Sequence, residues 1–269
     1  MKYVVIKCGG SVFDSLPKSF YENISELHQS GVWTPIIVHG GGPLISSMLD
    51  QMGVKSTFIN GLRVTTEEVL DVVEMALSGS MNKQIVRKLN AVKGKGYGIS
   101  GVDGSLLEAI PTEQAQEQDL GYVGEVRTVN TSIIENITDQ GFIPVISPIG
   151  MDESGQRFNI NADMAASSIA QALGAKLLFI SDIPGIYVEE NGVKKTLHYA
   201  GKEKIEQLIS TEVIYGGMIP KVQSALKALA HSVPEVSIVN GLEQNSLVDF
   251  MDGKMVGTRI SLDKEMPYV

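Results

Sequence analysis

The opening segment constrains the fold more than any other part of the chain. Residues 2–6 (KYVVI) are followed by Lys7, Cys8 and the pair Gly9-Gly10. An unbroken apolar run rich in β-branched residues is typical of a strand buried on both faces, as in parallel sheets. Lysine is costly to bury alone, and glycine lets a ligand approach the backbone N–H groups. The pattern indicates half of an anion site, although a lysine that reaches solvent explains it equally well.

Apolar strands and helical patterns alternate along most of the 269 residues. A helix from Pro17 to about Gln29 separates the first strand from a second one at 35–38, which predicts a right-handed crossover between parallel strands. Further buried strands are expected at 142–146, 176–180 and 235–239, shorter ones at 97–100, 106–109 and 121–128, and a hairpin at Asn191-Gly192. This order predicts an α/β protein with an open, mainly parallel central sheet sandwiched by helices.

Two glycine-rich turns precede helices. His39–Pro43 joins the second strand to a helix, so it offers N–H groups where the helix dipole is positive. Gly216–Lys221 opens another helix, with Pro220 expected at its first position and Lys221 at its second. A cation there opposes the dipole, unless the helix end and the ammonium face one shared anion. The alternative is an exposed lysine that tolerates a small penalty.

An acidic residue begins the helix that is expected to end near Gly174. If Asn161 caps this helix, Asp163 lies in its first turn, where a carboxylate is electrostatically stable. That structural role is sufficient by itself. The functional alternative is that Asp163 holds two nearby lysines in position.

The middle of the chain predicts two further helices and a surface loop. The helices, near 66–77 and 81–92, suit either a cover for the sheet, which is the commoner arrangement, or a dimer contact. The polar stretch 112–119 reads as a surface loop that could act as a lid.

Composition excludes several classes of protein. A net charge of −9 argues against binding to a nucleic-acid backbone. No apolar run approaches the length that crosses a bilayer, and the first residues do not resemble a signal peptide. Cys8 is the single cysteine, so no intrachain disulfide can form and a cytoplasmic location is expected. Cys8 itself reads as a small core residue rather than a nucleophile.

Several motifs fail on inspection. Gly96–Gly101 matches G-x-G-x-x-G, but it follows a predicted helix, whereas a dinucleotide fingerprint needs a strand, a turn and then a helix. The chain has no P-loop, no protein-kinase signature set and no Cys/His spacing for zinc. Of the four histidines, only His39 lies near a glycine turn, and a packed or solvent-facing role is expected for it.

Six motifs together carry a resemblance to the amino acid kinase family. They are Lys7–Ser11 (KCGGS), His39–Pro43 (HGGGP), Asn60–Thr65 (NGLRVT), Asn159–Asp163 (NINAD), Ser181–Gly185 (SDIPG) and Gly216–Lys221 (GGMIPK). The match runs in order from Lys2 to about Ile260. The glycine turns resemble those of members that act on aspartate, glutamate, carbamate or UMP, whereas the third and fourth motifs resemble members that act on N-acetyl-L-glutamate.

The resemblance implies a role for each matching residue. Lys7 and Lys221 would stabilise the transferring phosphoryl group, and Asp163 would orient both lysines. Arg63 and Asn159 would hold N-acetyl-L-glutamate, Arg63 by a bidentate grip on the α-carboxylate. The backbone N–H groups expected to face phosphates or substrate belong to Gly9, Gly10, Gly41 and Gly42. The adenine nucleotide would contact Asp182, Ile183, Pro184, Gly185, Ile186, Tyr187, Val213, Ile214 and Tyr215.

The resemblance also implies the organisation of the enzyme. The whole chain would form one kinase domain with an amino-acid lobe at about 1–174, an ATP lobe at about 175–262 and a loose tail at 263–269. Mg²⁺ would bridge the phosphates of ATP without a protein cage of its own. Arginine-inhibited members of the family carry an extra N-terminal helix that helps to form a hexamer, whereas the first strand here starts at Lys2. A homodimer without arginine feedback inhibition is therefore expected.

Three other functions stay open from the sequence. A related kinase acting on another acid, such as an aminoadipate derivative, would use the same Arg63 and Asn159. A nucleotide-binding regulator without catalysis is disfavoured because both lysines and Asp163 are present. An NAD-dependent enzyme is disfavoured by the failed fingerprint.

Overall fold

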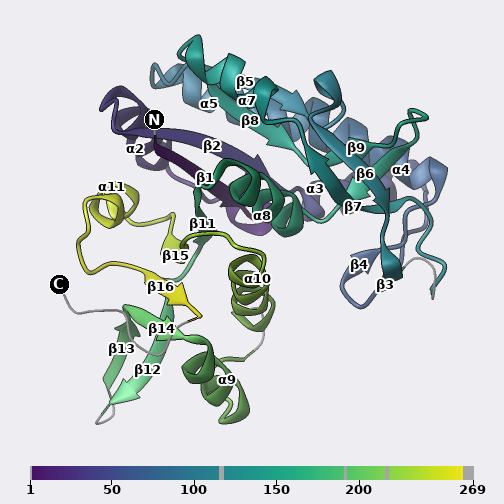
Figure 1. Ribbon diagram of the computed structural model, residues 1–269. Coiled ribbons are helices and arrows are strands. Elements are labelled where there is room, and N and C mark those ends of the chain that lie inside the picture. Colours follow the sequence, from purple (N-terminus) through teal and green to yellow (C-terminus); the bar gives the residue numbers. More distant parts are fainter. Residues whose placement is uncertain (1, 115–117, 191–192, 216–217, 263–269) are drawn as a thin grey trace.

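A computed structural model describes residues 2–114, 118–190, 193–215 and 218–262 (Figure 1). The expected tail and the turn residues Asn191 and Gly192 therefore lie outside the described residues. Among the described helices, none is long and apolar enough to span a membrane.

An eight-stranded sheet forms the centre of the molecule, in the order β14-β16-β15-β11-β1-β2-β8-β5. Neighbouring strands are parallel, apart from the antiparallel pair β15 and β16. The predicted open, mainly parallel sheet is confirmed. The strands are β1 (Lys2–Cys8), β2 (Trp33–His39), β5 (Gly96–Ser100), β8 (Ile143–Ser147), β11 (Lys176–Ser181), β14 (Tyr199–Gly201), β15 (Val236–Asn240) and β16 (Thr258–Ser261).

Helices cover both faces of this sheet. Side chains of a strand alternate between the faces, and consecutive apolar residues of the strands therefore need a cover on each face. Val5 of β1 packs in one core cluster, whereas its neighbours Val4 and Ile6 pack in another. The first cluster includes side chains of α7 (Thr131–Asp139), α8 (Ala162–Leu173), α9 (Lys202–Ser210) and α10 (Met218–Ala230). The second includes side chains of α1 (Gly10–Phe13), α2 (Lys18–Gln29), α5 (Asn82–Ala91) and α11 (Ser246–Met251).

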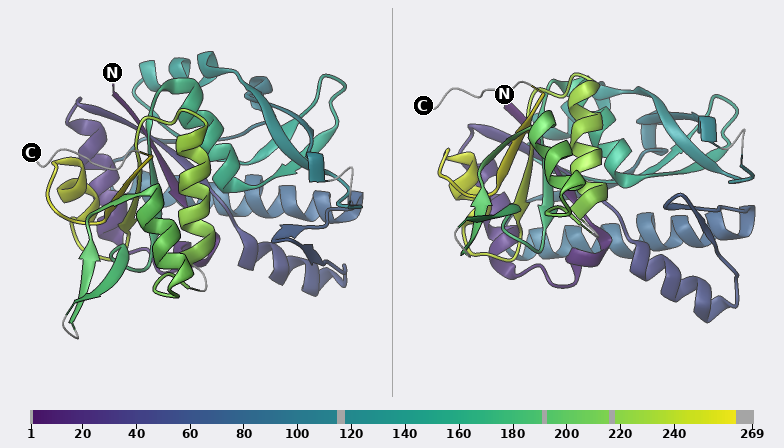
Figure 2. Two further views of the ribbon diagram at one scale, coloured as in Figure 1. Left: turned by 60° about the horizontal axis from the view of Figure 1, so that its bottom comes forward. Right: turned by 90° about the horizontal axis from the view of Figure 1, so that it is seen from below.

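A long helical segment differs from its prediction. The two helices expected near 66–77 and 81–92 are continuous, because the π-helix η1 (Met75–Met81) joins α4 (Glu67–Glu74) to α5. This segment runs beside α3 (Gly42–Met52), and Figure 2 shows these blue helices extending away from the yellow C-terminal elements.

Shorter strands complete the fold. The strands β6 (Leu107–Pro111), β7 (Val123–Val129), β9 (Ile149–Met151) and β10 (Arg157–Ile160) pair in a closed ring, and η2 (Asp103–Ser105) precedes them. The strands β3 (Phe58–Ile59) and β4 (Leu62–Arg63) form a hairpin, as do β12 (Ile186–Glu190) and β13 (Val193–Leu197). Asn60 and Gly61 both have positive φ angles, 50° and 81°, which explains why an Asn-Gly pair turns the first hairpin.

One helix boundary was wrong. Helix α10 includes Met218 and Ile219, so Pro220 is its third described residue and not its first, and Lys221 is the fourth. Proline is tolerated there because the N–H groups of a first helical turn have no partner within the helix. Lys221 still lies at the positive end of the helix dipole.

Candidate active site

The predicted site residues gather at one edge of the central sheet. Strand β1 lies between β2 and β11, and all three are parallel. Lys7 near the end of β1, the glycine turn after β2 and Asp182 after β11 therefore meet at the carboxyl ends of adjacent strands. Ligands of open α/β sheets bind at such an edge.

Lys7 is held by the acid predicted to orient it. Its Nζ lies 2.6 Å from Oδ1 of Asp163, and the two side chains are only 16% and 21% exposed. Asn161 caps helix α8 as expected: its Oδ1 accepts a hydrogen bond from the Asp163 N–H at 2.8 Å. The cap fixes the first turn of α8, and that turn carries the carboxylate towards β1.

The two N-terminal glycine turns are packed backbone against backbone. A Cβ atom on Gly10 would lie 2.8 Å from the Gly42 nitrogen and 2.9 Å from the Gly41 Cα. A side chain at position 10 would therefore separate the turns. Gly10 and Gly42 begin helices α1 and α3, so their N–H groups have no partner within those helices. The contact between the turns brings these donors together beside Lys7.

Lys221 occupies a more open environment. Its Nζ donates a hydrogen bond to Ser181 Oγ at 2.8 Å and lies 3.6 Å from Oδ1 of Asp182. Burial lowers the pKa of Lys221 and the positive charge of Lys7 lowers it further, whereas Asp182 opposes the change. The contact of Lys221 with Ser181, the last residue of β11, places the Lys221 ammonium at the carboxyl end of the strand that pairs with β1, which carries Lys7.

Asp163 contacts Lys7 directly but reaches the helix of Lys221 only through a serine. Its Oδ2 accepts a hydrogen bond at 3.3 Å from Ser224, which is on the same helix as Lys221. The charge of Asp163 also raises the pKa of Lys221, but less than the nearer Asp182 does. The expected contact of Asp163 with Lys7 is thus present, whereas the ion pair of Lys221 is with Asp182.

Arg63 is buried and already engaged. Its guanidinium donates to Ser56 Oγ at 2.7 Å, to Ser46 Oγ at 2.9 Å and to the Gly42 carbonyl at 3.4 Å. It also stacks on the Phe58 ring, 4.5 Å from its centroid. Burial lowers the pKa of Arg63, and the Asp50 carboxylate partly opposes this. A hollow of about 500 Å³ lies beside these groups, between α3 and the β3–β4 hairpin.

Thr65 connects Arg63 to the other predicted substrate residue. Asn159 donates from Nδ2 to Thr65 Oγ1 at 3.1 Å, and that hydroxyl donates to the Arg63 carbonyl at 2.7 Å. The two motifs that indicated N-acetyl-L-glutamate are therefore in contact, although 94 residues separate Thr65 from Asn159.

The expected nucleotide residues divide by exposure. Ile186 and Ile214 are core residues, so only their backbone could meet a ligand, and the Ile186 N–H already donates to Thr258. Val213 and Tyr215 are exposed on the surface. Gly185 has a φ of +148° and lies against Thr258, and both features exclude a side chain there. The described loop also holds the exposed Asp182 and the half-buried Ile183, Pro184 and Tyr187, the last at the start of β12.

Sequence reasoning missed the serines that hold the charged groups. Ser181 and Ser224 bind Lys221 and Asp163, and Ser46 and Ser56 bind Arg63. Ser181 directly precedes Asp182, and Ser224 follows Lys221 by three residues, which places it on the same helix face. Those spacings were visible signals. The positions of Ser46 and Ser56 relative to Arg63 depend on tertiary packing and gave no such signal.

Two other candidates behave as the sequence predicted. Cys8 is 2% exposed and burial raises its pKa to about 12, so it is a core thiol and not a nucleophile. His39 is fully buried rather than solvent-facing.

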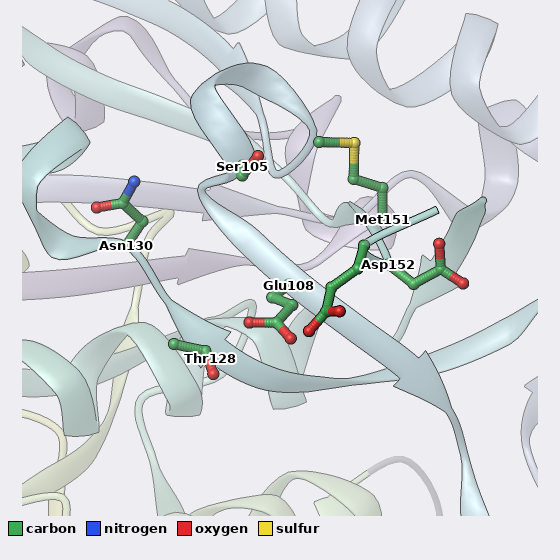
Figure 3. Close-up of a pocket in the computed structure, with 7 residues that line it drawn as sticks. Ser105, Glu108, Thr128, Asn130, Met151 and Asp152 are labelled. Carbon is green, nitrogen blue, oxygen red and sulfur yellow. The ribbon is translucent and has the colours of Figure 1, made fainter. Parts of the chain in front are cut away.

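A second hollow lies away from these residues, on the ring of short strands (Figure 3). It measures about 290 Å³ and is lined by Glu108, Asp152 and Glu153 together with Thr128 and Asn130. Arg127 of β7 pairs with Glu108 of β6 and with Glu153 in the turn after β9. This acidic lining does not suit a phosphate ligand.

The fold and the paired lysines and glycine turns at one sheet edge define a phosphotransferase of the α/β class. The model of the amino acid kinase family matches residues 2–240, so the chain belongs to that family.

Among its relatives is the acetylglutamate kinase of Oceanobacillus iheyensis, which is 45% identical over 269 residues, 100% of both chains. The acetylglutamate kinase of Geobacillus kaustophilus is 50% identical over 241 residues, 89% of this chain and 90% of the relative.

Solved structures agree on the fold. A protein of Streptococcus mutans has a TM-score of 0.78 at 30% identity, covering 97% of this chain and 99% of its own. The carbamate kinase of Giardia lamblia, with bound AMP-PNP, has a TM-score of 0.70 at 18% identity, covering 97% and 99%.

Proposed function

We propose that this enzyme transfers the γ-phosphoryl group of ATP to the side-chain carboxylate of N-acetyl-L-glutamate, a step of arginine biosynthesis. The products are ADP and N-acetyl-L-glutamyl 5-phosphate. The observation that carries the proposal is the contact between Arg63, Thr65 and Asn159 beside the paired glycine turns. Full-length similarity to acetylglutamate kinases supports it.

The acceptor needs no general base. A side-chain carboxylate has a pKa of about 4.3, so it is ionised at neutral pH. The obstacle is its repulsion by the triphosphate. Catalysis then depends on positioning and on stabilising the charge of the transferring group.

Lys7 and Lys221 would supply that stabilisation from two sides. Lys7 is held at 2.6 Å by Asp163, so its ammonium is ordered before ATP binds. Among the described residues, Lys221 contacts the Ser181 hydroxyl and, at a longer distance, Asp182, and a phosphate oxygen could replace either. The N–H groups of Gly9, Gly10, Gly41 and Gly42 would bind phosphate and acceptor oxygens.

Arg63 and Asn159 would hold N-acetyl-L-glutamate, with Arg63 binding its α-carboxylate. Three contacts to Ser46, Ser56 and the Gly42 carbonyl occupy part of the guanidinium. A bidentate grip would therefore replace at least one of them, and the 3.4 Å contact to Gly42 is the longest.

The nucleotide would bind beside Asp182–Tyr187 and Val213–Tyr215. With it, we propose the division into an amino-acid lobe (about 1–174) and an ATP lobe (about 175–262). The exposed Tyr215 and Val213 offer apolar surface for an adenine ring.

Mg²⁺ would bridge the phosphates of ATP. It favours octahedral oxygen ligands, retains waters and commonly takes only one or two carboxylates. Asp182, a 62% exposed carboxylate at the edge of the site, fits one such position. In the described ranges no group of three or more His, Cys, Asp or Glu side chains could hold a metal ion alone. When bound, the ion would neutralise part of the phosphate charge.

A homodimer in the cytoplasm, insensitive to arginine, completes the proposal. The edge strand β5 carries the exposed Tyr97, an aromatic side chain that offers contact surface to a second copy. Light scattering should give twice the mass of one chain. A hexamer, or inhibition by micromolar arginine, would contradict it.

A coupled assay of ADP release tests the reaction. N-acetyl-L-glutamate should be turned over, whereas glutamate, aspartate and UMP should not. A preference for an N-acetylated aminoadipate would change the acceptor but keep the mechanism. No ADP release with any acid would overturn the proposed activity.

A further inference from the structure

His39 is a buried polar residue that the proposed reaction does not use. It ends β2 directly before the glycine turn and is 0% exposed. Its Nδ1 lies 3.2 Å from the Gly40 carbonyl oxygen. Burial lowers its pKa to about 4, so the ring is neutral at neutral pH and one of its nitrogens is an acceptor.

Asn82 faces the other ring nitrogen. This residue begins α5 and is also 0% exposed. Its Nδ2 donates to the Val145 carbonyl at 2.8 Å and to the Ile99 carbonyl at 3.2 Å, and its Oδ1 accepts from Lys83 at 3.1 Å. Two carbonyls on one side and an ammonium on the other fix the orientation of this amide.

The fixed amide determines the tautomer of His39. The Nδ2 of Asn82 lies 3.3 Å from His39 Nε2 and shares its two N–H groups among Nε2 and the two carbonyls. An amide nitrogen cannot accept a hydrogen bond, so Nε2 is the unprotonated, accepting nitrogen. The ring proton is therefore on Nδ1, where it can be donated to the Gly40 carbonyl. A proton on Nε2 would set two donors against each other inside the core.

Space for this network is provided by a glycine. A Cβ atom on Gly98 of β5 would lie 2.0 Å from the Oδ1 of Asn82. Gly98 belongs to the G-x-G-x-x-G match that is not a dinucleotide fingerprint here. Its missing side chain leaves the space that Asn82 needs to reach the carbonyls of Ile99 and Val145.

The Gly40 carbonyl and the Gly41 N–H belong to one peptide plane. In a trans peptide these groups point in opposite directions. A carbonyl held on the His39 side therefore directs the Gly41 N–H away from the buried ring. A Cβ atom on Gly40 would lie 3.6 Å from the Gly10 nitrogen. The Gly40–Gly41 peptide is therefore adjacent to the first glycine turn.

We propose that His39 and Asn82 are positioning residues, which fix the Gly40–Gly41 peptide so that the Gly41 N–H faces the phosphoryl or acceptor oxygens. The proposal rests on the proposed function, since it assigns that N–H to the same reaction. His39 touches no reacting atom; it acts through the Gly40 carbonyl.

Nitrogen-15 NMR of the imidazole in the wild-type enzyme tests the tautomer without any assay. The expected spectrum at neutral pH is that of a neutral ring with the proton on Nδ1. A proton on Nε2, or a doubly protonated ring, would overturn the proposal even if the enzyme is fully active.

Substitutions test the consequence. In His39→Asn the side-chain amide can still donate to the Gly40 carbonyl, so kcat/KM should remain close to that of the wild type. In His39→Leu the donor to the Gly40 carbonyl is lost, and kcat/KM should fall roughly 10- to 100-fold, mainly in kcat. The loss is expected to be smaller than for removal of an N–H group, because the Gly41 N–H is still present and only its direction is no longer fixed. Equal losses in both variants would mean that only the shape of the ring matters, and would overturn the proposal.

His28 provides a matched control. Its Nε2 also contacts a glycine carbonyl, that of Gly141, at 3.1 Å. Gly141 precedes β8, so this contact lies at the amino ends of the parallel strands, whereas the site lies at their carboxyl ends. His28→Leu should leave kcat unchanged. If it lowers kcat as much as His39→Leu does, the effect is general destabilisation and the proposal fails. A wild type without kinase activity would instead refute the proposed function, and the NMR test would still stand.

Discussion

The two lysines of the site differ in how firmly the protein holds them. Lys7 is 16% exposed and its Nζ is 2.6 Å from Asp163, an acid whose helix is capped by Asn161. Lys221 is 29% exposed, and its acidic partner Asp182 is 3.6 Å away and itself 62% exposed. The comparison indicates a division of work: Lys7 is ordered by the protein, whereas Lys221 is left able to exchange its contacts for a phosphate.

Removing either ammonium should cause the largest loss. Lys7→Ala and Lys221→Ala should each lower kcat by about 10²-fold or more, because each loses a charge that stabilises the transferring group. Only Lys7→Ala should also lower Tm clearly, since it leaves the 21% exposed Asp163 carboxylate without its cation. Steady-state kinetics and thermal melts of both variants measure this. Wild-type turnover in either variant would contradict the role of that lysine.

Removing the charge of Asp163 should cause the second largest loss of kcat. Asp163→Asn removes the charge that holds Lys7 but keeps the Lys7 ammonium, so kcat should fall by roughly 10- to 100-fold. Asp182→Asn is the matched variant on the other lysine. At saturating Mg²⁺, which compensates for a weakened metal ligand, it should have a smaller effect on kcat because its contact with Lys221 is longer and more exposed. A larger loss of kcat in Asp182→Asn than in Asp163→Asn would mean that Lys221, and not Lys7, is the lysine that depends on its carboxylate.

Arg63→Lys should act on substrate binding rather than on turnover. Lysine keeps the charge but loses the planar fork and the stacking on Phe58, so KM for the acetylated acid should rise by about tenfold, equivalent to about 1.4 kcal/mol. The KM for ATP should stay near the wild-type value. A change confined to the KM for ATP would assign Arg63 to the wrong ligand.

The smallest expected effect is on pH dependence. Because the pKa of Lys221 is lowered by burial and by Lys7, its ammonium should lose its proton below the pH of an ordinary lysine. Activity should therefore decline from that lower pH upward. The unfolded chain binds more protons between the lowered and the ordinary pKa, so the free energy of unfolding should rise with pH in that window. In Lys221→Arg, residual activity should lose the alkaline decline; an unchanged decline would mean that another group titrates.

Much of this site could be predicted because its residues belong to short local motifs. The first strand with Lys7 near its end, the glycine turn after His39 and the cap at Asn161 depend on neighbouring residues, and all three are present. The parallel sheet that brings them together follows from the alternation of strands and helices.

The rest depends on contacts between distant segments. No local pattern indicates that Ser46 and Ser56 hold Arg63, or that Asn82 at the start of α5 contacts the His39 ring at the end of β2. The π-helical join at 75–81 was missed because both flanking segments have ordinary helical periodicity. The start of α10 was misplaced because proline was assumed to mark the first residue of the helix.

The most direct measurement is a crystal structure of the enzyme with ADP, aluminium fluoride and N-acetyl-L-glutamate, in which the fluoride stands for the transferring phosphoryl group. Both Lys7 Nζ and Lys221 Nζ should lie about 3 Å from fluoride atoms, with Lys221 released from Ser181. A complex in which only one of the two ammonium groups touches the fluoride would mean that the two lysines do not act on the same phosphoryl group.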